Sequence, residues 1–174
     1  MTASNEQRKI RYAVVGLGWI SQVAVLPAFA NAENSELVAL ISDDPTKREE
    51  LSRKYGVQQT YSYAEYDRCL KSGEVDAVYI GLPNHLHREY TVRAAQAGVH
   101  VLCEKPMAVT EQDCEAMIAA CRDNNVKLMI AYRLHFEPAN MQAVEIIKSG
   151  QIGEPRFFSS VFTQQVEEAN VRVK

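Results

Sequence analysis

The stretch of sequence that decides the fold is RYAVVGLGWIS, residues 11–21. It begins with an apolar run, Arg11–Val15, of the length and composition of a buried strand. A Gly-Leu-Gly turn follows directly, and the residues from Ile20 onward have the period of an amphipathic helix. Gly16 permits a tight turn, and Gly18 lets backbone N–H groups approach a pyrophosphate at the start of a helix. A strand, this turn and a helix in this order predict a dinucleotide-binding loop.

The third position of the loop is Ser21, where the dinucleotide-binding pattern usually has glycine. Serine is small enough for close packing of helix against strand, so the departure lowers the specificity of the motif without cancelling it. A plain tight turn is the alternative interpretation of Gly16 and Gly18.

The rest of the chain alternates short apolar runs with helical patterns, which predicts an α/β fold: a Rossmann domain with a doubly wound parallel sheet. We expect strands at Arg11–Val15, Leu37–Ser42, Gln59–Tyr61, Val75–Ile80, His100–Cys103 and Lys127–Ala131. We expect helices at Ile20–Ala30, Thr46–Tyr55, Ala64–Ser72, Leu86–Gln96, Glu111–Asn124 and Ala139–Ser149. Four of the expected helices are followed by a glycine, which readily adopts the left-handed conformation found after a helix end. These glycines are Gly56, Gly73, Gly98 and Gly150. Pro27 predicts a kink or an early stop in the first helix.

The rhythm changes after Tyr132, where a new helix and an aromatic strand, Arg156–Phe162, are expected. We therefore place a dinucleotide-binding domain at residues 1–134 and the first helix and strand of an incomplete substrate domain at residues 135–174. Because no later strand is available to pair with Arg156–Phe162, the sequence is interpreted as the front part of a longer protein.

Composition and charge exclude several classes of protein. The 174 residues are 47% hydrophobic and 24% charged, as in an ordinary globular chain. Lys and Arg number 19 against 22 Asp and Glu, a net charge of −3, so no basic field favours nucleic acid as a partner. The chain begins with no apolar stretch of signal-peptide type, and nowhere do about 18 apolar residues run together, so we expect a cytoplasmic protein without a membrane partner. The four cysteines form no Cys-x-x-Cys pair, which favours reduced, buried thiols over a zinc site or disulfides.

The residues after the second expected strand are candidates for reading the adenosine ribose. A hydroxyl with a nearby cation suits the 2′-phosphate of NADP, and Ser42 with Lys47 offers this pair. An acid suits the 2′-hydroxyl of NAD, and Asp43 offers it, while Asp44 is equally well explained as a helix cap. Lys47 and Arg48 are alternatively a solvated helix face. We favour NADP with NAD as the alternative, and the choice depends on the direction in which Asp43 points.

Two further motifs follow the fourth and fifth expected strands, at the carboxyl edge where open α/β sheets bind ligands. The first is PNHLH, residues 83–87, and the second is Glu104-Lys105-Pro106. The two histidines are two residues apart, unlike the i, i+4 pair of helical metal ligands, and we expect no metal site. Asn84 is a candidate cap for the following helix. Lys105 is suited to binding a substrate oxygen or a developing alkoxide, with a simple surface turn as the alternative.

Together these motifs resemble the glucose–fructose oxidoreductase/inositol dehydrogenase (Gfo/Idh/MocA) family. The resemblance consists of Gly-Leu-Gly-x-Ile-Ser, Pro-Asn-His-x-His, Glu-Lys-Pro and then Ala131-Tyr132-Arg133, in this order. Residues 132–138, YRLHFEP, are most similar to the glucose–fructose oxidoreductase branch, and the resemblance spans nearly all of the chain.

The resemblance implies an NAD(P)-dependent oxidoreductase that transfers a hydride between nicotinamide and a sugar, polyol or related polyhydroxy compound. It implies Lys105 as the catalytic residue, followed by a cis bond to Pro106. The implied cofactor contacts are Gly16, Gly18, Trp19, Ile20, Ser42, Lys47, Pro83, Asn84, His87 and Glu104. It further implies a second domain with a mainly antiparallel sheet, an acid/base His or Tyr beyond Lys174 and homo-oligomers formed through that sheet. The chain alone is thus expected to be catalytically incomplete, and the alternative is a non-catalytic dinucleotide-binding module or sensor.

Overall fold

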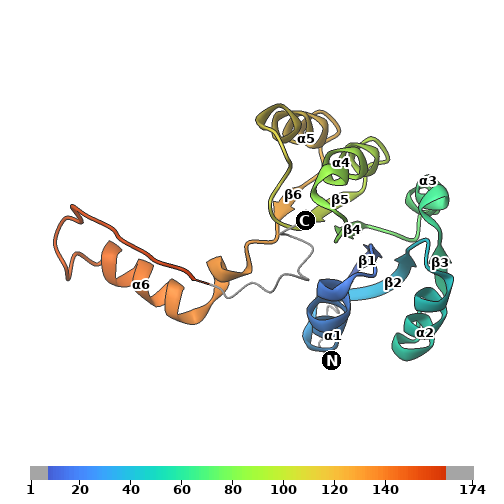
Figure 1. The fold of residues 1–174 in the computed structure, drawn as a ribbon, viewed down its shortest axis with the longest axis horizontal. Helices are drawn as coiled ribbons and strands as arrows, with labels where there is room; N and C mark the ends of the chain where they lie inside the picture. Colours follow the sequence, from blue (N-terminus) through green and yellow to red (C-terminus); the bar gives the residue numbers. More distant parts are fainter. Residues whose placement is uncertain (1–7, 164–174) are drawn as a thin grey trace, which may run out of the picture. The chain divides into compact units, whose positions relative to one another are not determined.

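The computed structural model describes residues 8–163, which fall into two compact units, one ending at Tyr132 and the next beginning at Arg133. The first unit is built on a six-stranded sheet in the order β3-β2-β1-β4-β5-β6, with every neighbouring pair parallel (Figure 1). The strands are β1 Ile10–Val15, β2 Ser35–Ile41, β3 Gln59–Tyr61, β4 Ala77–Ile80, β5 His100–Cys103 and β6 Leu128–Ile130. The predicted doubly wound parallel sheet is confirmed.

The register of the sheet aligns the carboxyl ends of all six strands. Val15 at the end of β1 lies opposite Ile41 of β2 and Ile80 of β4. The last residues of β3, β5 and β6 continue the same row. The loops that leave the strands therefore share one edge, and the strand order reverses between β1 and β4, where ligands bind in such sheets.

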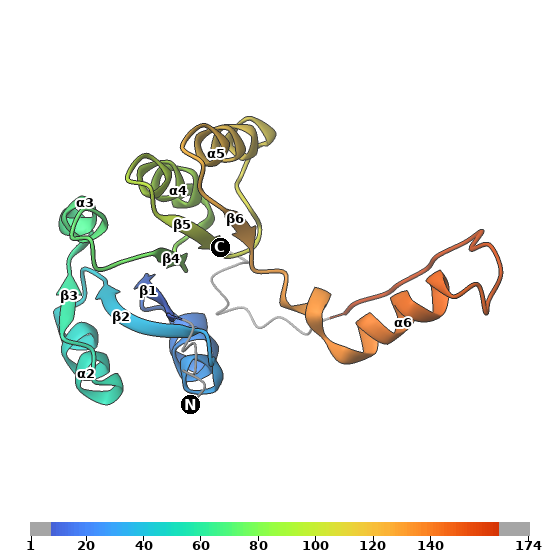
Figure 2. The same ribbon diagram turned by 180° about the vertical axis from the view of Figure 1, so that it is seen from behind.

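Helices cover both faces of the sheet (Figures 1 and 2). One face carries η1 Ser21–Val25, α1 Leu26–Ala28, η2 Phe29–Asn31 and α2 Pro45–Tyr55. The other carries η3 Tyr63–Glu65, α3 Tyr66–Leu70, η4 Asn84–Leu86, α4 His87–Gln96 and α5 Glu111–Asp123. Strand side chains alternate between two buried clusters. Val15, Ile41 and Ile80 pack with α3, α4 and α5, whereas Val14, Leu40 and Tyr79 pack with α1 and α2.

The helix after β1 does not stop at Pro27. It begins at Trp19, passes into a π-helical turn in which the Leu26 N–H donates to the Ser21 carbonyl, and continues through α1 and η2 to Asn31. The predicted distortion thus takes the form of a change in helical type beside the proline, which has no N–H to give. The left-handed conformation predicted at Gly56, Gly73, Gly98 and Gly150 is confirmed, with φ between 68° and 76°.

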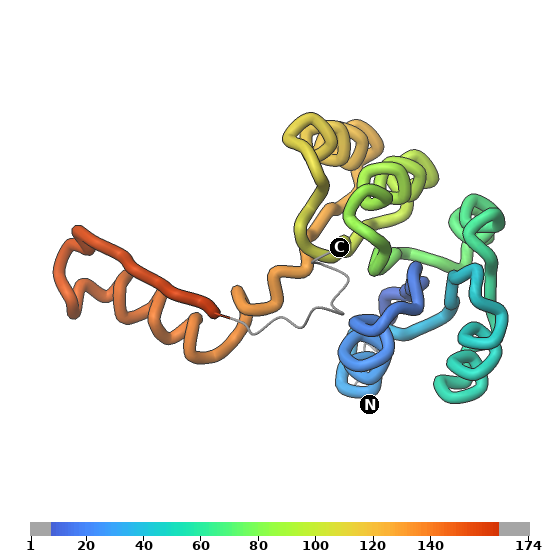
Figure 3. The backbone as a smooth tube through the Cα atoms, in the orientation of Figure 1, coloured from blue at the N-terminus to red at the C-terminus, as the bar shows by residue number. Residues whose placement is uncertain are grey.

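The second unit contains η5 Arg133–Phe136 and α6 Pro138–Lys148, after which the chain turns and runs back beside α6 (Figure 3). The expected strand at Arg156–Phe162 is wrong, because these residues form no strand. A strand requires a hydrogen-bonded neighbour, and the described part of this unit provides none. The apolar side chains of the segment, Phe157, Phe158, Val161 and Phe162, are 84–87% exposed. The expected domain extends to residue 174, and its part from residue 164 onward lies outside the described residues. No helix in the described part of the chain is long and apolar enough to cross a membrane.

Candidate functional site

The glycine loop after β1 is locked against the two strands beside it. The Gly16 N–H donates to the carbonyl of Ile41 at 2.9 Å, and the Gly81 N–H donates to that of Val15 at 2.8 Å. Gly16 has a φ of 88°, and a Cβ atom there would lie 2.6 Å from the Gly81 carbonyl oxygen. Only glycine is compatible with both the conformation and the close approach.

The surface of the loop is open above Gly18. A Cβ atom at this position would meet no atom within 4 Å, and no side chain caps the start of the helix that follows. Trp19 beside it is 75% exposed. The start of the helix therefore presents backbone N–H groups and open space to a ligand, which is the shape that a pyrophosphate requires.

Ser21, the departure from the glycine pattern, joins this helix to the loop. Its side chain is fully buried, and its Oγ donates to the Gly16 carbonyl at 2.6 Å. A Cβ atom at Gly81 would lie 2.8 Å from this Oγ, so helix and sheet touch where both residues are small. The close packing expected of a serine is present.

At the end of β2, several candidate residues are hydrogen-bonded within the segment itself, and the Asp44 N–H donates to Ser42 Oγ at 3.2 Å. Asp44 caps α2: its Oδ1 accepts from the Lys47 N–H at 3.0 Å, and its Oδ2 pairs with Lys47 Nζ at 3.1 Å. These bonds lower the pKa of Asp44. Ser42 is 5% exposed, and its carbonyl accepts from the guanidinium of Arg48. The cap interpretation of Asp44 is confirmed, and Arg48 lies closer to the strand end than a solvated face would place it.

Asp43 points toward the segment that follows β3. Its carboxylate accepts from the Tyr63 N–H at 2.7 Å, at the start of η3. The acid that favoured NAD in the sequence thus accepts a hydrogen bond from the backbone N–H of Tyr63.

Beyond β4 and β5, the Glu104 carboxylate is held by two donors. The Tyr79 hydroxyl donates to its Oε1 at 2.9 Å, and the Lys105 N–H donates to its Oε2 at 3.1 Å. Burial and the adjacent carboxylate raise the pKa of Tyr79, which keeps the hydroxyl protonated as a donor. Lys105 is exposed, and its bond to Pro106 is cis as expected. Sequence reasoning missed Tyr79, since an apolar strand position gives no sign of what its hydroxyl reaches.

The buried ring of His87 connects the loop after β4 to the loop after β5. It is fully buried, with Nδ1 2.9 Å from the Pro106 carbonyl oxygen and Nε2 2.8 Å from that of Leu82. His87 therefore supports the two loops and offers no free ring nitrogen to a ligand. Pro83 and Asn84 are exposed at the same edge, and no side-chain cap is formed by Asn84.

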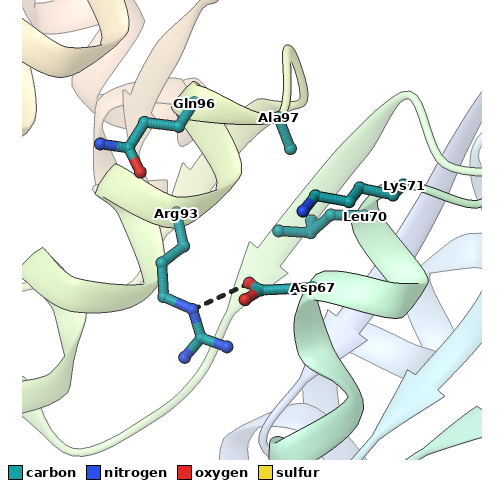
Figure 4. A pocket seen from close by; sticks show the side chains of 6 residues that line it. All are labelled: Asp67, Leu70, Lys71, Arg93, Gln96 and Ala97. Atoms are coloured by element: carbon teal, nitrogen blue, oxygen red, sulfur yellow. Dashed lines mark hydrogen bonds and ion pairs between the residues drawn. The ribbon is translucent and has the colours of Figure 1, made fainter.

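A separate pocket lies between α3 and α4 (Figure 4). Both helices end there, where the chain leads back to the amino-terminal ends of β4 and β5, so it belongs to the opposite edge of the sheet. Arg93 in its wall is already bonded to Asp67 at 3.0 Å and Glu89 at 2.9 Å. The pocket is lined by Asp67, Leu70, Lys71, Arg93, Gln96 and Ala97. Residues 8–163 contain no group of three His, Cys, Asp or Glu side chains that could hold a metal ion.

A comparison with protein families matches residues 10–132 to the model GFO_IDH_MocA, described as an oxidoreductase family with an NAD-binding Rossmann fold. The chain belongs to the Gfo/Idh/MocA oxidoreductase family. The predicted resemblance is thereby confirmed, together with the Rossmann fold class and a nicotinamide-dinucleotide-binding domain.

Relatives in the Gfo/Idh/MocA family include sugar dehydrogenases. D-xylose 1-dehydrogenase [NADP(+)] of Haloarcula marismortui is 36% identical over 160 residues, which cover 91% of this chain and 44% of that protein. Aldose-aldose oxidoreductase of Caulobacter crescentus, solved with glycerol, is 47% identical with a TM-score of 0.81 over 84% of this chain and 44% of that one. The 3-ketoreductase KijD10 of Actinomadura kijaniata, solved with TDP-benzene and NADP, is 29% identical. Its TM-score is 0.74 over 82% of this chain and 44% of that one. The chain thus spans somewhat less than half the length of these relatives.

Proposed function

We propose that this chain supplies the dinucleotide-binding part of an NAD(P)-dependent oxidoreductase that acts on a sugar, polyol or related polyhydroxy compound. The observation that carries the proposal is the loop at Gly16 and Gly18. It is hydrogen-bonded to a neighbouring strand at Gly16 and has open space beside Gly18. The activities named for the relatives, which act on xylose and other aldoses, support this substrate class.

The order of the strands supports one direction for a dinucleotide on this edge. With the pyrophosphate on the β1 loop, the adenosine lies over β2 at Ser42, on one side of the point between β1 and β4 where the strand order reverses. The nicotinamide then lies on the other side, over the ends of β4 and β5. Pro83, Asn84 and Glu104 follow those two strands, whereas Trp19 and Ile20 belong to the loop between the two halves.

A nicotinamide bound there supplies or accepts the hydride, and the residues of the chain position the reacting partners. Lys105 follows Glu104 at the end of β5, and its exposed side chain is free to contact a substrate hydroxyl. We assign to Lys105 the catalytic role of polarising that hydroxyl and helping to remove its proton.

We propose NADP as the preferred cofactor. Ser42 and Lys47 provide a hydroxyl and a cation, and Asp43, the competing acid, is engaged by the Tyr63 N–H. The pair between Lys47 and Asp44 is 48% and 40% exposed, and exposed pairs contribute at most about 1 kcal/mol. A 2′-phosphate can therefore replace Asp44 as the partner of Lys47 at little cost.

The test is calorimetric titration of NADPH and NADP⁺ into this chain and into Gly18→Val. The branched side chain fills the open space above the loop, and we expect binding to be lost while circular dichroism shows an unchanged fold. Ala143→Val adds similar bulk on exposed α6 and should bind as wild type does. Undiminished binding by Gly18→Val would remove the loop from the site. A non-catalytic module would also bind, and it is distinguished by a longer protein that turns over no sugar or polyol. In an active longer protein, Lys105→Ala should lower turnover, and an unchanged turnover would remove Lys105 from the catalytic role.

We also propose a cytoplasmic location and assembly into homo-oligomers through a second-domain sheet. The four cysteines, all free thiols, support the first, and the exposed apolar run at residues 157–162 supports the second. Light scattering of the longer protein tests the assembly.

A further inference from the structure

We propose that Tyr79 is a positioning residue that fixes the Glu104 carboxylate beside the nicotinamide, so that the site binds the oxidised cofactor in preference to the reduced one. The inference rests on the proposed function above, because it requires the nicotinamide to lie over the ends of β4 and β5.

The Tyr79 ring is held in one place by its surroundings. It lies in β4 opposite Leu102 of β5, is 2% exposed and packs in the cluster beneath α1 and α2. A Cβ atom at Gly81 would lie 2.9 Å from the Cε1 atom of Tyr79, so the glycine leaves room for the ring. The hydroxyl is therefore delivered to Glu104 by rigid packing rather than by a mobile side chain.

The Glu104 carboxylate has hydrogen-bond donors on both oxygens but no cationic partner. Tyr79 holds Oε1 and the Lys105 N–H holds Oε2, at 2.9 and 3.1 Å. Among the ion pairs of residues 8–163, none includes Glu104. A partly buried anion that is oriented and yet unpaired is complementary to a cationic ligand.

The two redox states of the cofactor differ in this respect. The oxidised nicotinamide ring carries a positive charge, and the reduced ring is neutral. A carboxylate fixed at the end of β5 therefore attracts the oxidised ring more strongly. Without the Tyr79 hydroxyl, one oxygen loses its donor, and the partly exposed carboxylate is free to turn toward solvent.

The experiment titrates NADP⁺ and NADPH separately into this chain and into Tyr79→Phe, which keeps the ring and removes the donor. Loss of the donor lets the carboxylate turn away from the ring, and we expect a roughly three- to tenfold loss of NADP⁺ affinity. The NADPH affinity should stay within about twofold, since a neutral ring gains little from the carboxylate. The measured quantity is the ratio of the two dissociation constants.

Tyr66→Phe is the matched control. Tyr66 is also fully buried, and its hydroxyl donates to the Tyr90 carbonyl at 3.1 Å, but on the opposite face of the sheet. Loss of that bond costs stability without changing the ratio. Glu104→Gln removes the charge itself and should reproduce the loss of NADP⁺ affinity even if Tyr79→Phe folds poorly.

The outcomes separate this inference from the proposed function. An unchanged ratio in Tyr79→Phe or in Glu104→Gln, or an equal change in Tyr66→Phe, overturns the role of Tyr79 while cofactor binding stands. A wild-type chain that binds neither cofactor overturns the proposed function and this inference with it.

Discussion

At the end of β2, Lys47 is the cation that we propose to distinguish NADP from NAD. Lys47 is bonded to Asp44 and lies five residues after Ser42. We expect Lys47→Ala to weaken NADPH binding about tenfold, through loss of a charge-assisted hydrogen bond to the 2′-phosphate, and to leave NADH binding nearly unchanged. Added salt should reduce the difference in NADPH affinity between wild type and Lys47→Ala, because the Lys47 ammonium group is exposed.

Lys54→Ala is the control for Lys47→Ala. It removes the same charge from the last turn of α2, where Lys54 lies over the Tyr55 ring. Tighter binding of NADH than NADPH by wild type, or equal losses of both in Lys47→Ala, would assign the site to NAD instead.

Gly16 and Gly18 look alike in the sequence but differ in what a side chain would meet. Gly16→Ala combines a φ of 88° with a contact of 2.6 Å to the Gly81 carbonyl oxygen, and we expect a loss of about 1–3 kcal/mol of unfolding free energy. Gly18→Ala meets no atom within 4 Å, so its unfolding free energy should stay within about 1 kcal/mol of wild type. Urea unfolding followed by circular dichroism measures both, and equal effects would refute the distinction.

Among the elements, β1 and β4 are tied together at their amino-terminal ends by one carboxylate. Asp76 accepts from the backbone N–H and the guanidinium of Arg11, with 2.9 Å between Arg11 Nη2 and Asp76 Oδ1. These bonds hold the pKa of Asp76 well below its usual range. We expect Asp76→Asn to lower the unfolding free energy by about 1–3 kcal/mol at pH 7, because charge-assisted bonds to a carboxylate are lost.

The sign of the pH dependence follows from the direction of that shift. A carboxylate whose pKa is lowered by folding stabilises the protein above its unfolded pKa of about 3.9, and this stabilisation is lost as the pH falls further. The difference between wild type and Asp76→Asn should therefore shrink in urea unfolding at pH 3. Asp123→Asn, which loses only an exposed pair with its neighbour Arg122, should show little effect at either pH. A difference that grows in acid would contradict the assignment.

The sequence predicted the sheet and its helices because their signals are local: apolar runs, helical period, caps and glycine stops. The strand at Arg156–Phe162 failed because pairing depends on a partner, which composition alone does not reveal. The candidate site divides in the same way. The Gly16 turn is a local property of the chain, whereas the contact from Tyr79 to Glu104 joins residues 25 apart in sequence. The direction of Asp43 likewise depends on Tyr63 of a neighbouring segment, so sequence reasoning could pose the question without answering it.

For the molecule as a whole, all three buried clusters of the described residues lie before Tyr132. We expect a chain shortened to residues 1–132 to keep its thermal midpoint within about 2 °C, since it keeps all the buried clusters of the described residues. It should also bind cofactor as the 174-residue chain does. A large drop in either would show that the first unit depends on the second.

Comparing the 174-residue chain with the chain shortened to residues 1–132 also tests whether the exposed apolar segment of the second unit causes association. Phe157 and Phe158 are 87% and 86% exposed, and a contiguous apolar surface of this kind promotes association. Light scattering should show concentration-dependent association of the 174-residue chain and a monodisperse shortened one. Replacing both phenylalanines by serine in the 174-residue chain should reduce the association, and an unchanged association would place its cause elsewhere.

Trp19, exposed beside the glycine loop, has an optical consequence. It is the single tryptophan of the chain, so all indole emission originates at this edge of the sheet. Reduced nicotinamide absorbs where indole emits, and a cofactor lying across the loop would quench Trp19 by energy transfer. The chain therefore carries an intrinsic fluorophore at the point where ligand arrival can be timed, in a stopped-flow instrument and without any label.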